Sequence, residues 1–196
     1  GGQLGTRVLF IRDEGYDPYS SDDLFVSFAL GASYLPLVLG PVSVGLTAEY
    51  DVGQRTDKAR GQKSFLVLHR VAVGAQARFA LGNWFAAFVQ AAPAAQYAGA
   101  SLDDGGMDRF LVADDWSWAL DTSGGLAARV AKIGDSAEPA AGFWLFAEGG
   151  YSFAGELDMT FAPEEDEDDP RQYGSVALPS FSPSGGMMRL GAQVTF

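Results

Sequence analysis

The final nine residues of the sequence, Met188-Arg-Leu-Gly-Ala-Gln-Val-Thr-Phe196, alternate between apolar residues and small or polar ones. Successive side chains of a β-strand point to opposite faces, so a strand here has one face that carries only apolar residues. That face consists of Met188, Leu190, Ala192, Val194 and Phe196. The opposite face carries Arg189 and Gln193. The stretch therefore predicts a strand between an apolar and a polar environment.

Seven further segments alternate in the same way. They lie at about 4–12, 24–34, 42–52, 64–79, 84–97, 116–131 and 142–154. Two uncharged runs, 24–48 and 79–102, are long enough for transmembrane helices, but they contain turn residues such as Pro36, Pro41 and Gly82. We therefore interpret both runs as parts of β-hairpins, and the chain as all-β with eight strands.

The connections between the segments alternate in length. Long ones lie near 13–23, 53–63, 98–115 and 155–185, and shorter ones near 35–41, 80–83 and 132–141. An even number of strands with alternating long and short connections is the plan of an antiparallel up-and-down barrel. A strand of about 11 residues, tilted by ~40°, spans roughly 28 Å, the thickness of a hydrocarbon core. The sequence thus predicts one domain over residues 1–196, an eight-stranded antiparallel transmembrane β-barrel.

In each segment every second residue is apolar, and we call this set the apolar parity. It indicates which side of the barrel wall faces lipid. It carries no charge over the middle of any segment, and its aromatic residues gather near the segment ends, as at two membrane interfaces. Those toward the long loops are Tyr50, Phe65, Tyr97, Trp118 and Phe153, and those toward the short turns are Tyr34, Phe79, Phe85, Phe143 and Phe196. We expect this parity to face outward. A soluble ligand-binding barrel with an apolar interior is the alternative, and it would place the charged parity in water.

These features together resemble a known class of membrane protein. An alternating terminal strand that ends on Phe196 is similar to the signal that the barrel-assembly machinery reads in bacterial outer-membrane barrels. The pattern over the whole chain resembles small barrels of the OmpA/OmpX type. The resemblance implies a bacterial outer membrane, periplasmic termini, extracellular long loops, and outer-membrane lipid and lipopolysaccharide as surroundings. It also implies an assembly role for Met188, Leu190, Ala192, Val194 and Phe196.

The inward parity carries charges of both signs. They are Arg7, Glu49, Asp51, Arg70, Arg78, Asp121, Arg129, Glu148 and Arg189. An eight-stranded barrel is only wide enough for its own side chains, so five bases and four acids predict a network of ion pairs that fills the lumen. A narrow ion channel along the same charges is the alternative interpretation.

Composition excludes several kinds of site. The chain has no Cys and one His, so thiol catalysis, disulfides and Cys-ligated zinc are ruled out, and we expect no metal or cofactor. A formal net charge of −12 argues against nucleic acid as a partner, because phosphate binding needs a basic face. The fourth long connection contains an acidic run, Glu164, Glu165, Asp166, Glu167, Asp168 and Asp169. We interpret this run as a solvated loop, with divalent-ion or partner binding as the alternative.

The single histidine, His69, lies on the outward parity. A lipid-modifying enzyme would need a Ser and a carboxylate beside it. The residues two positions away are Val67 and Val71, and Asp121 belongs to the inward parity. We therefore assign no catalytic residue.

Pro93 lies within the fifth segment, on its outward parity. Proline cannot donate a ladder hydrogen bond, and a closed barrel has no free edge to accommodate it. We therefore expect a bulge there, or a strand that ends earlier.

The sequence favours a non-enzymatic outer-membrane barrel with a structural or interaction role. It would bind through its acidic loops or as a subunit of a cell-envelope complex, because 19 of the 25 acids lie in the four long connections. Three alternatives stay open: a narrow ion channel, a lipid-modifying membrane enzyme, and a soluble ligand-binding barrel.

Overall fold

The computed structural model of the chain describes residues 1–59, 62–103, 110–133, 141–163 and 175–196. Within them the structure is almost entirely β, with one three-residue 3-10 helix, η1 (Glu14–Tyr16). The strands are β1 (Gly2–Ile11), β2 (Leu24–Leu39), β3 (Val42–Ala59), β4 (Gln62–Ala80), β5 (Phe85–Asp103), β6 (Phe110–Ile133), β7 (Ala141–Ala154), β8 (Thr160–Pro163), β9 (Val176–Ala177) and β10 (Gly185–Thr195). In this part of the chain no helix is long and apolar enough to cross a membrane.

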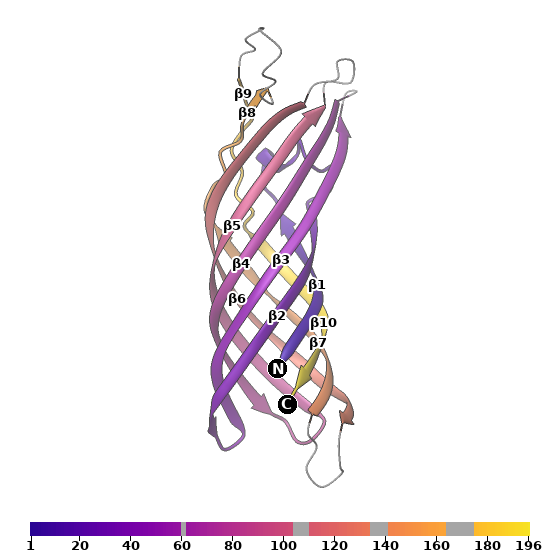
Figure 1. Ribbon diagram of the computed structural model, residues 1–196, viewed down its shortest axis with the longest axis vertical. Helices are drawn as coiled ribbons and strands as arrows, with labels where there is room; N and C mark the ends of the chain where they lie inside the picture. Colours follow the sequence, from indigo (N-terminus) through magenta and orange to yellow (C-terminus); the bar gives the residue numbers. More distant parts are fainter. Residues whose placement is uncertain (60–61, 104–109, 134–140, 164–174) are drawn as a thin grey trace.

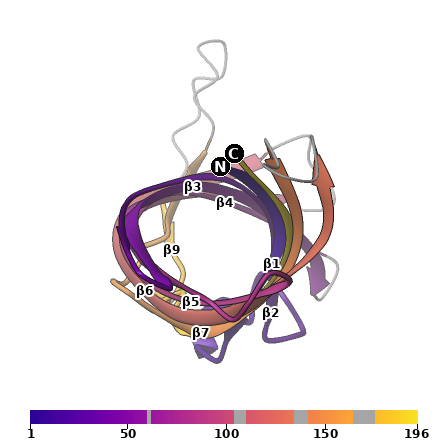
Figure 2. The ribbon, with the colours of Figure 1, turned by 90° about the horizontal axis from the view of Figure 1, so that it is seen from below.

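Eight of the strands close into a ring. Strands β1 to β7 each pair antiparallel with their neighbour in sequence, and β10 pairs with both β7 and β1. The β5–β6 pairing completes the circuit, and the view along the barrel shows the closed wall with the two termini side by side (Figure 2). The predicted eight-stranded antiparallel up-and-down barrel is therefore confirmed.

The two ends of the barrel differ in their connections. At the short-turn end, β2 and β3 are joined through Gly40 and Pro41, and β4 and β5 through residues 81–84. Gly40 and Gly82 have φ values of 62° and 88°, a region that glycine adopts without the strain of a side chain. Strands β8 and β9 lie at the opposite, long-loop end (Figure 1).

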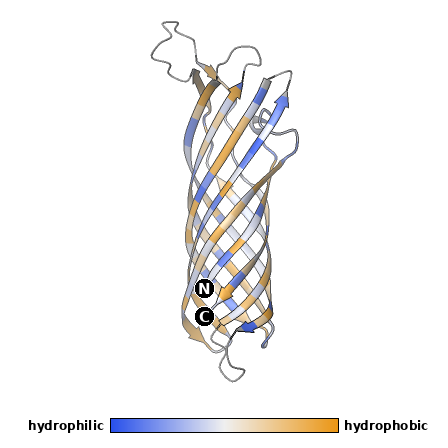
Figure 3. Cartoon of the chain, turned by 45° about the vertical axis from the view of Figure 1, so that its right-hand side comes forward, coloured by the Kyte–Doolittle hydropathy of each residue, from blue (hydrophilic) through white to orange (hydrophobic). Residues whose placement is uncertain are grey.

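The outer wall of the ring is apolar and the lumen is polar. Leu46, Leu126 and Leu190 are each 61% exposed on the outside, while Arg7 and Asp121 are buried inside. Apolar and polar residues alternate along the strands in the same way over the whole wall (Figure 3). A continuous apolar surface of this extent is stable in lipid and not in water. The barrel is therefore transmembrane, and the soluble ligand-binding alternative is wrong.

Strands β3 and β4 are longer than the sequence predicted. The connection 53–63 was expected as a long loop, but its described residues, 53–59 and 62–63, continue both strands, and Ala59 pairs with Gln62. This stretch is rich in polar residues, and we read polarity as a sign of a loop. A strand that has left the membrane faces water, so its outer residues no longer need to be apolar.

Strands β5 and β6 also extend into their predicted loop. Most of 98–115 is strand, because β5 ends at Asp103 and β6 begins at Phe110. Beyond the ring, β3 has no pairing with β2 after Gly53, and β6 has none with β7 before Ala119. The far ends of β3 to β6 therefore form a four-stranded extension at the long-loop end, which we call the raised sheet (Figure 1).

The bulge predicted at Pro93 does not form. The β4–β5 pairing is interrupted at Pro93 and its neighbour, between the pair of Ala72 with Ala94 and the pair of Ala75 with Ala91. It resumes in the same register. On its other side Pro93 pairs with Leu120 of β6, so neighbours on both sides hold the strand across the missing hydrogen bond. A bulge instead accommodates Pro36, where the β2–β3 register shifts.

Replacing Leu190 by Arg should destabilise the barrel. The new charge would lie on the outer wall in the hydrocarbon core, at a cost of about 2–4 kcal/mol. The measurement is the free energy of unfolding by urea in lipid vesicles. Thr56→Arg is the control, because Thr56 is exposed in the raised sheet, and its free energy of unfolding should stay near that of the parent. Equal destabilisation by both substitutions would contradict this placement of the membrane.

Candidate functional site

Four inward side chains form a compact ion-pair cluster in the lumen. The guanidinium of Arg7, on β1, lies 3.0 Å from Asp51 on β3 and 3.2 Å from Asp121 on β6. Arg70, on β4, lies 2.8 Å from Asp51 and also pairs with Asp121. None of these side chains is more than 7% exposed. Each carboxylate bridges both arginines, so the charges of this Arg7 cluster cancel.

A second cluster lies beside the first, since Arg189 of β10 pairs across the strands with Arg7 of β1. The Nε of Arg189 donates to Glu148 of β7 at 2.9 Å, and the guanidinium also forms an ion pair with Glu49 of β3. Gln90 donates to the other oxygen of Glu148 at 2.7 Å. This Arg189 cluster therefore contains one base and two acids.

The remaining two inward arginines lie apart from both clusters. Arg78 donates to Gln193 at 2.8 Å, and its guanidinium carbon lies 4.3 Å from the ring centre of Trp144. The guanidinium carbon of Arg129 lies 4.5 Å from the same ring. Neither arginine forms an ion pair with another of the described residues. The structure thus joins seven of the nine predicted lumen charges in two clusters and separates Arg78 and Arg129 from them.

The ion pairs connect strands that are not neighbours in the ring. Arg70 reaches from β4 to Asp121 on β6, and Arg189 reaches from β10 to Glu49 on β3. Side chains that cross the lumen in this way fill it and link its opposite walls. Between the Arg7 cluster and the long-loop end lies a cavity of about 30 Å³, enough for roughly one or two water molecules.

An apolar core closes the lumen at the long-loop end. Parts of the first and fourth long connections pack there against inward residues of the strands. The buried members of this mouth core are Leu9, Ile11, Tyr16, Tyr19, Phe25, Leu66, Leu68, Ala98, Ala100, Ala113, Leu157, Met159, Phe161, Phe181 and Met187. The two connections therefore form a cover for the lumen.

Phe181 lies at the centre of the contact between the two connections. Its ring centre is 5.8 Å from that of Tyr16 and 5.6 Å from that of Tyr19. Asp13 fastens the same contact, because its carboxylate accepts hydrogen bonds from the backbone N–H groups of Gly15 and Ser182, both at 2.9 Å. The cover is thus held by apolar packing and by a carboxylate that bridges the two connections.

Burial keeps the tyrosine hydroxyls of the cover neutral. Desolvation is the main cause that raises the pKa of both Tyr16 and Tyr19 above the ordinary value. The Tyr19 hydroxyl has no hydrogen-bond partner among the described residues. A raised pKa favours the neutral tyrosine in the folded state. This contribution to the stability of the cover is therefore fully present below the ordinary tyrosine pKa, and it is lost as the pH rises through the higher pKa of the folded state.

The first connection also docks on the raised sheet. Arg55 of β3 donates to the Ser20 hydroxyl and to Asp22, each at 3.0 Å. The backbone N–H of Ser21 donates to Asp57 of β3. Hydrogen bonds from the backbone N–H groups of Lys58 and Ser21 lower the pKa of the Asp57 carboxyl. Polar contacts therefore hold the rim of the cover, while apolar contacts hold its centre.

The mouth core had a signal in the sequence that parity analysis passed over. At Val8–Ile11 and Phe65–Leu68, both parities are apolar. A strand that is apolar on both faces is buried on both faces. Leu9, Ile11 and Leu66 point inward and are buried, as the apolar inner face of those two runs indicates.

On the outer wall, His69 belongs to a row of aromatic residues. Its Nδ1 lies 2.7 Å from the Tyr50 hydroxyl, and its ring centre lies 6.2 Å from that of Tyr97. Tyr97 in turn contacts Trp116, with 5.1 Å between ring centres. Such a row across β3 to β6 is typical of the interfacial girdle of a membrane barrel. Neither a serine nor a carboxylate contacts His69 in the described structure.

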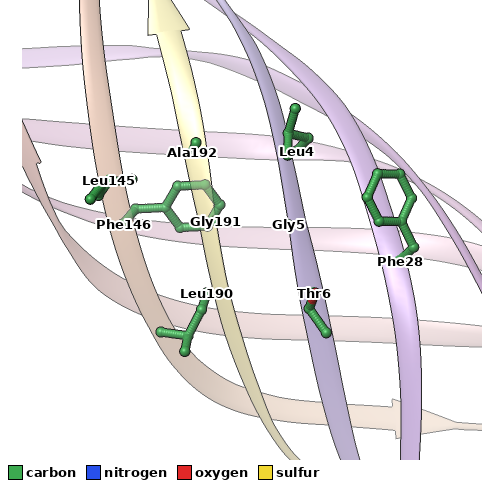
Figure 4. A pocket seen from close by; sticks show the side chains of 9 residues that line it. All are labelled: Leu4, Gly5, Thr6, Phe28, Leu145, Phe146, Leu190, Gly191 and Ala192. Atoms are coloured by element: carbon green, nitrogen blue, oxygen red, sulfur yellow. The ribbon is translucent and has the colours of Figure 1, made fainter.

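A shallow depression interrupts the outer wall across β7, β10, β1 and β2. It has a volume of about 500 Å³, and Figure 4 shows the side chains that line it. Thr6 and Ala192 are small, whereas Leu4, Phe28 and Leu190 around them are large. The depression faces lipid and is apolar.

The other predicted site residues have different outcomes. The proposed assembly residues lie on the outer side of the last strand and its end, where Met188 is 53% and Phe196 89% exposed, and their role stays a prediction. The acidic run Glu164–Asp169 lies outside the described residues. Among the residues that the structure describes, no three His, Cys, Asp or Glu side chains form a group that could hold a metal ion.

Replacing Asp121 by Asn should destabilise the barrel by about 3–5 kcal/mol, because it leaves Arg7 and Arg70 with one carboxylate in a buried site. The measurement is unfolding by urea in detergent micelles, followed by gel mobility. Asp22→Asn is the control, since Asp22 forms an exposed ion pair with Arg55, and such pairs contribute about 0–1 kcal/mol. An Asp121→Asn protein as stable as the control would show that the Arg7 cluster does not hold the walls together.

Comparison with known proteins supports the fold. No protein-family model matches the chain, and no curated protein matches it by sequence. Among solved structures, Ail, the attachment invasion locus protein of Yersinia pestis, aligns over 100% of this chain and 96% of its own, with a TM-score of 0.54 and 13% identity. The transport unit of the autotransporter AIDA-I from Escherichia coli aligns over 100% and 89%, with a TM-score of 0.37 and 10% identity. The chain thus has the fold of a small outer-membrane β-barrel, consistent with the OmpA/OmpX type.

Proposed function

We propose that the chain is a non-enzymatic barrel of the bacterial outer membrane that presents its long-loop end to a partner. The observation that carries this proposal is the double closure of the lumen. Two ion-pair clusters fill the lumen, and the mouth core covers them. In the proposed orientation the termini and short turns face the periplasm, and the raised sheet and long loops face the outside of the cell.

The charge of the long connections supports binding at that end. They contain 19 of the 25 acids and only six of the 13 bases. A surface with this excess of negative charge attracts basic protein surfaces, and it attracts divalent cations that can bridge to the phosphates of lipopolysaccharide. The run Glu164–Asp169 is the densest part of this charge and our first choice for the contact.

The shared fold makes attachment a reasonable role, because Ail is by name an attachment and invasion protein. A place in a cell-envelope complex is the second candidate. The depression across β7, β10, β1 and β2 favours it, since a partner in the membrane would find an apolar recess there. These two roles use different surfaces of the same barrel.

The two functional alternatives each need a feature that the described residues do not supply. A narrow ion channel would need the cross-lumen ion pairs and the mouth core to open together. A lipid-modifying enzyme would need a nucleophile beside His69, and the hydroxyl that His69 contacts belongs to Tyr50, its neighbour in the aromatic row.

The purified protein should give no stable conductance of porin size in planar lipid bilayers, because the lumen is filled by paired charges and covered by the mouth core. Single-channel recording at neutral pH is the measurement. A known porin, reconstituted in the same way, is the positive control. Reproducible large current steps from the pure barrel would overturn the proposal of a closed lumen.

Bacteria that display the barrel should attach to cultured epithelial cells more than the same host without it. Neutralising the acidic run Glu164–Asp169 with Gln and Asn should reduce attachment severalfold. The control variant neutralises three acids of the first connection, Glu14, Asp17 and Asp23, and it should retain most of the attachment. If the displayed barrel adds no attachment, the adhesion role is wrong, and co-purification of neighbours from native membranes becomes the test of the envelope-complex role.

A further inference from the structure

The charges of the lumen do not balance along its length. The Arg7 cluster has two bases and two acids, and the Arg189 cluster has one base and two acids. Arg78 and Arg129 carry the remaining positive charge at the short-turn end, near the end of β4 and the end of β6. Two like charges that share one aromatic ring repel each other, and a bound anion would relieve the repulsion.

The two arginines are held in place by contacts that leave some of their donors free. Arg78 donates to Gln193 through Nη1, and the Trp144 indole N–H donates to Thr195 at 3.0 Å, which fixes the ring that both guanidinium groups contact. The Nη2 of Arg78 and the Nε of Arg129 are buried and have no hydrogen-bond partner among the described residues. Buried guanidinium nitrogens without an acceptor are costly, so an acceptor that reaches these atoms would stabilise them.

The two arginines lie near the short-turn end, beside a glycine that leaves room for the Trp144 and Arg129 nitrogens. This glycine is Gly142, and a Cβ atom there would be 2.9 Å from the Trp144 indole nitrogen and 3.4 Å from the Arg129 Nε. Arg78 and Arg129 are half-buried, whereas Arg7, Arg70 and Arg189 are buried. The pair therefore remains in contact with solvent although the rest of the lumen is filled.

We propose that Arg78, Arg129 and Trp144 form a binding site for a small oxyanion that enters the lumen from the short-turn end. A guanidinium presents N–H groups in a planar fork, which matches the oxygens of a phosphate or a carboxylate. The indole ring keeps the two forks in place by cation–π contact, and Gln193 orients one of them. This site is separate from the acidic long-loop end and does not depend on the proposed role in attachment.

The test is a titration of the whole barrel with inorganic phosphate in non-ionic detergent, followed by ¹⁵N NMR of the Trp144 indole and arginine Nε–H signals. Sodium chloride keeps the ionic strength constant. We expect saturable shifts for Trp144, Arg78 and Arg129, while Arg55 at the other end stays unchanged. The double variant Arg78→Gln and Arg129→Gln should lose at least about tenfold in affinity, read from the Trp144 signal. Arg55→Gln is the matched control and should bind phosphate like the parent.

Two further proteins keep the test decisive. Gly142→Ala retains both charges but crowds the Trp144 and Arg129 nitrogens, so it should weaken phosphate binding without loss of the folded gel mobility. Asp135→Asn with Glu138→Gln removes carboxylates from the connection 134–140, which lies outside the described residues. Phosphate binding that appears only in this last protein would show that the chain's own carboxylate occupies the site, and the proposal would be wrong. An absence of saturable shifts in every protein would also overturn it.

An anionic lipid is a second source of the same phosphate chemistry. A parallel titration therefore adds phosphatidylglycerol to the micelles in place of free phosphate. Because the site opens to the lumen and not to the outer wall, we expect free phosphate to shift the Trp144 signal and the lipid to leave it unchanged. A shift with the lipid alone would overturn the lumenal entry of the anion.

Discussion

The hydrogen-bond ladder between β1 and β10 is the interaction on which the rest of this barrel depends. It joins the two ends of the chain over ten rungs, from Gly2 with Val194 to Ile11 with Gly185. Without it, both strands would present unpaired backbone N–H and C=O groups to lipid, where no water can satisfy them and each costs several kcal/mol. Every other pairing in the ring is between neighbours in sequence or across one connection, so closure is the step that turns a sheet into a membrane-spanning wall.

Closure also determines what the interior must contain. Eight strands enclose a space that side chains just fill, and the inward residues that are fully buried are too far from bulk water to remain charged alone. The Arg7 cluster resolves this by giving each of two carboxylates two guanidinium partners. Toward the long-loop end the solution changes from charge to apolar packing, with Leu66 and Phe181 fully buried. The same wall is therefore filled in two chemically different ways.

The sequence predicted the wall well and the ends of the strands poorly. Period-two alternation is set by the contrast between lipid and lumen, so it marks Leu190 as outward and Arg189 as inward without knowledge of any partner. It weakens where the strand leaves the membrane, and for this reason we expected 53–63 to be a loop, whereas β3 continues to Ala59 and β4 begins at Gln62. The mouth core was missed because the contacts of Phe181 with Tyr16 and Tyr19 join segments far apart in the chain.

Parity also cannot assign partners inside the lumen. It gives the face of a side chain but neither its height nor its neighbours, so Arg78 and Arg70 were equivalent in the sequence although only Arg70 has carboxylate partners in the described structure. The mouth core has a related consequence for binding. Leu66, Leu68 and Ala100 on the inner side of β4 and β5 are buried by the cover, and moving the cover away would expose them to water. A partner at the long-loop end should therefore bind the outer surface of the cover and leave the lumen closed. Binding there need not affect the short-turn end of the barrel.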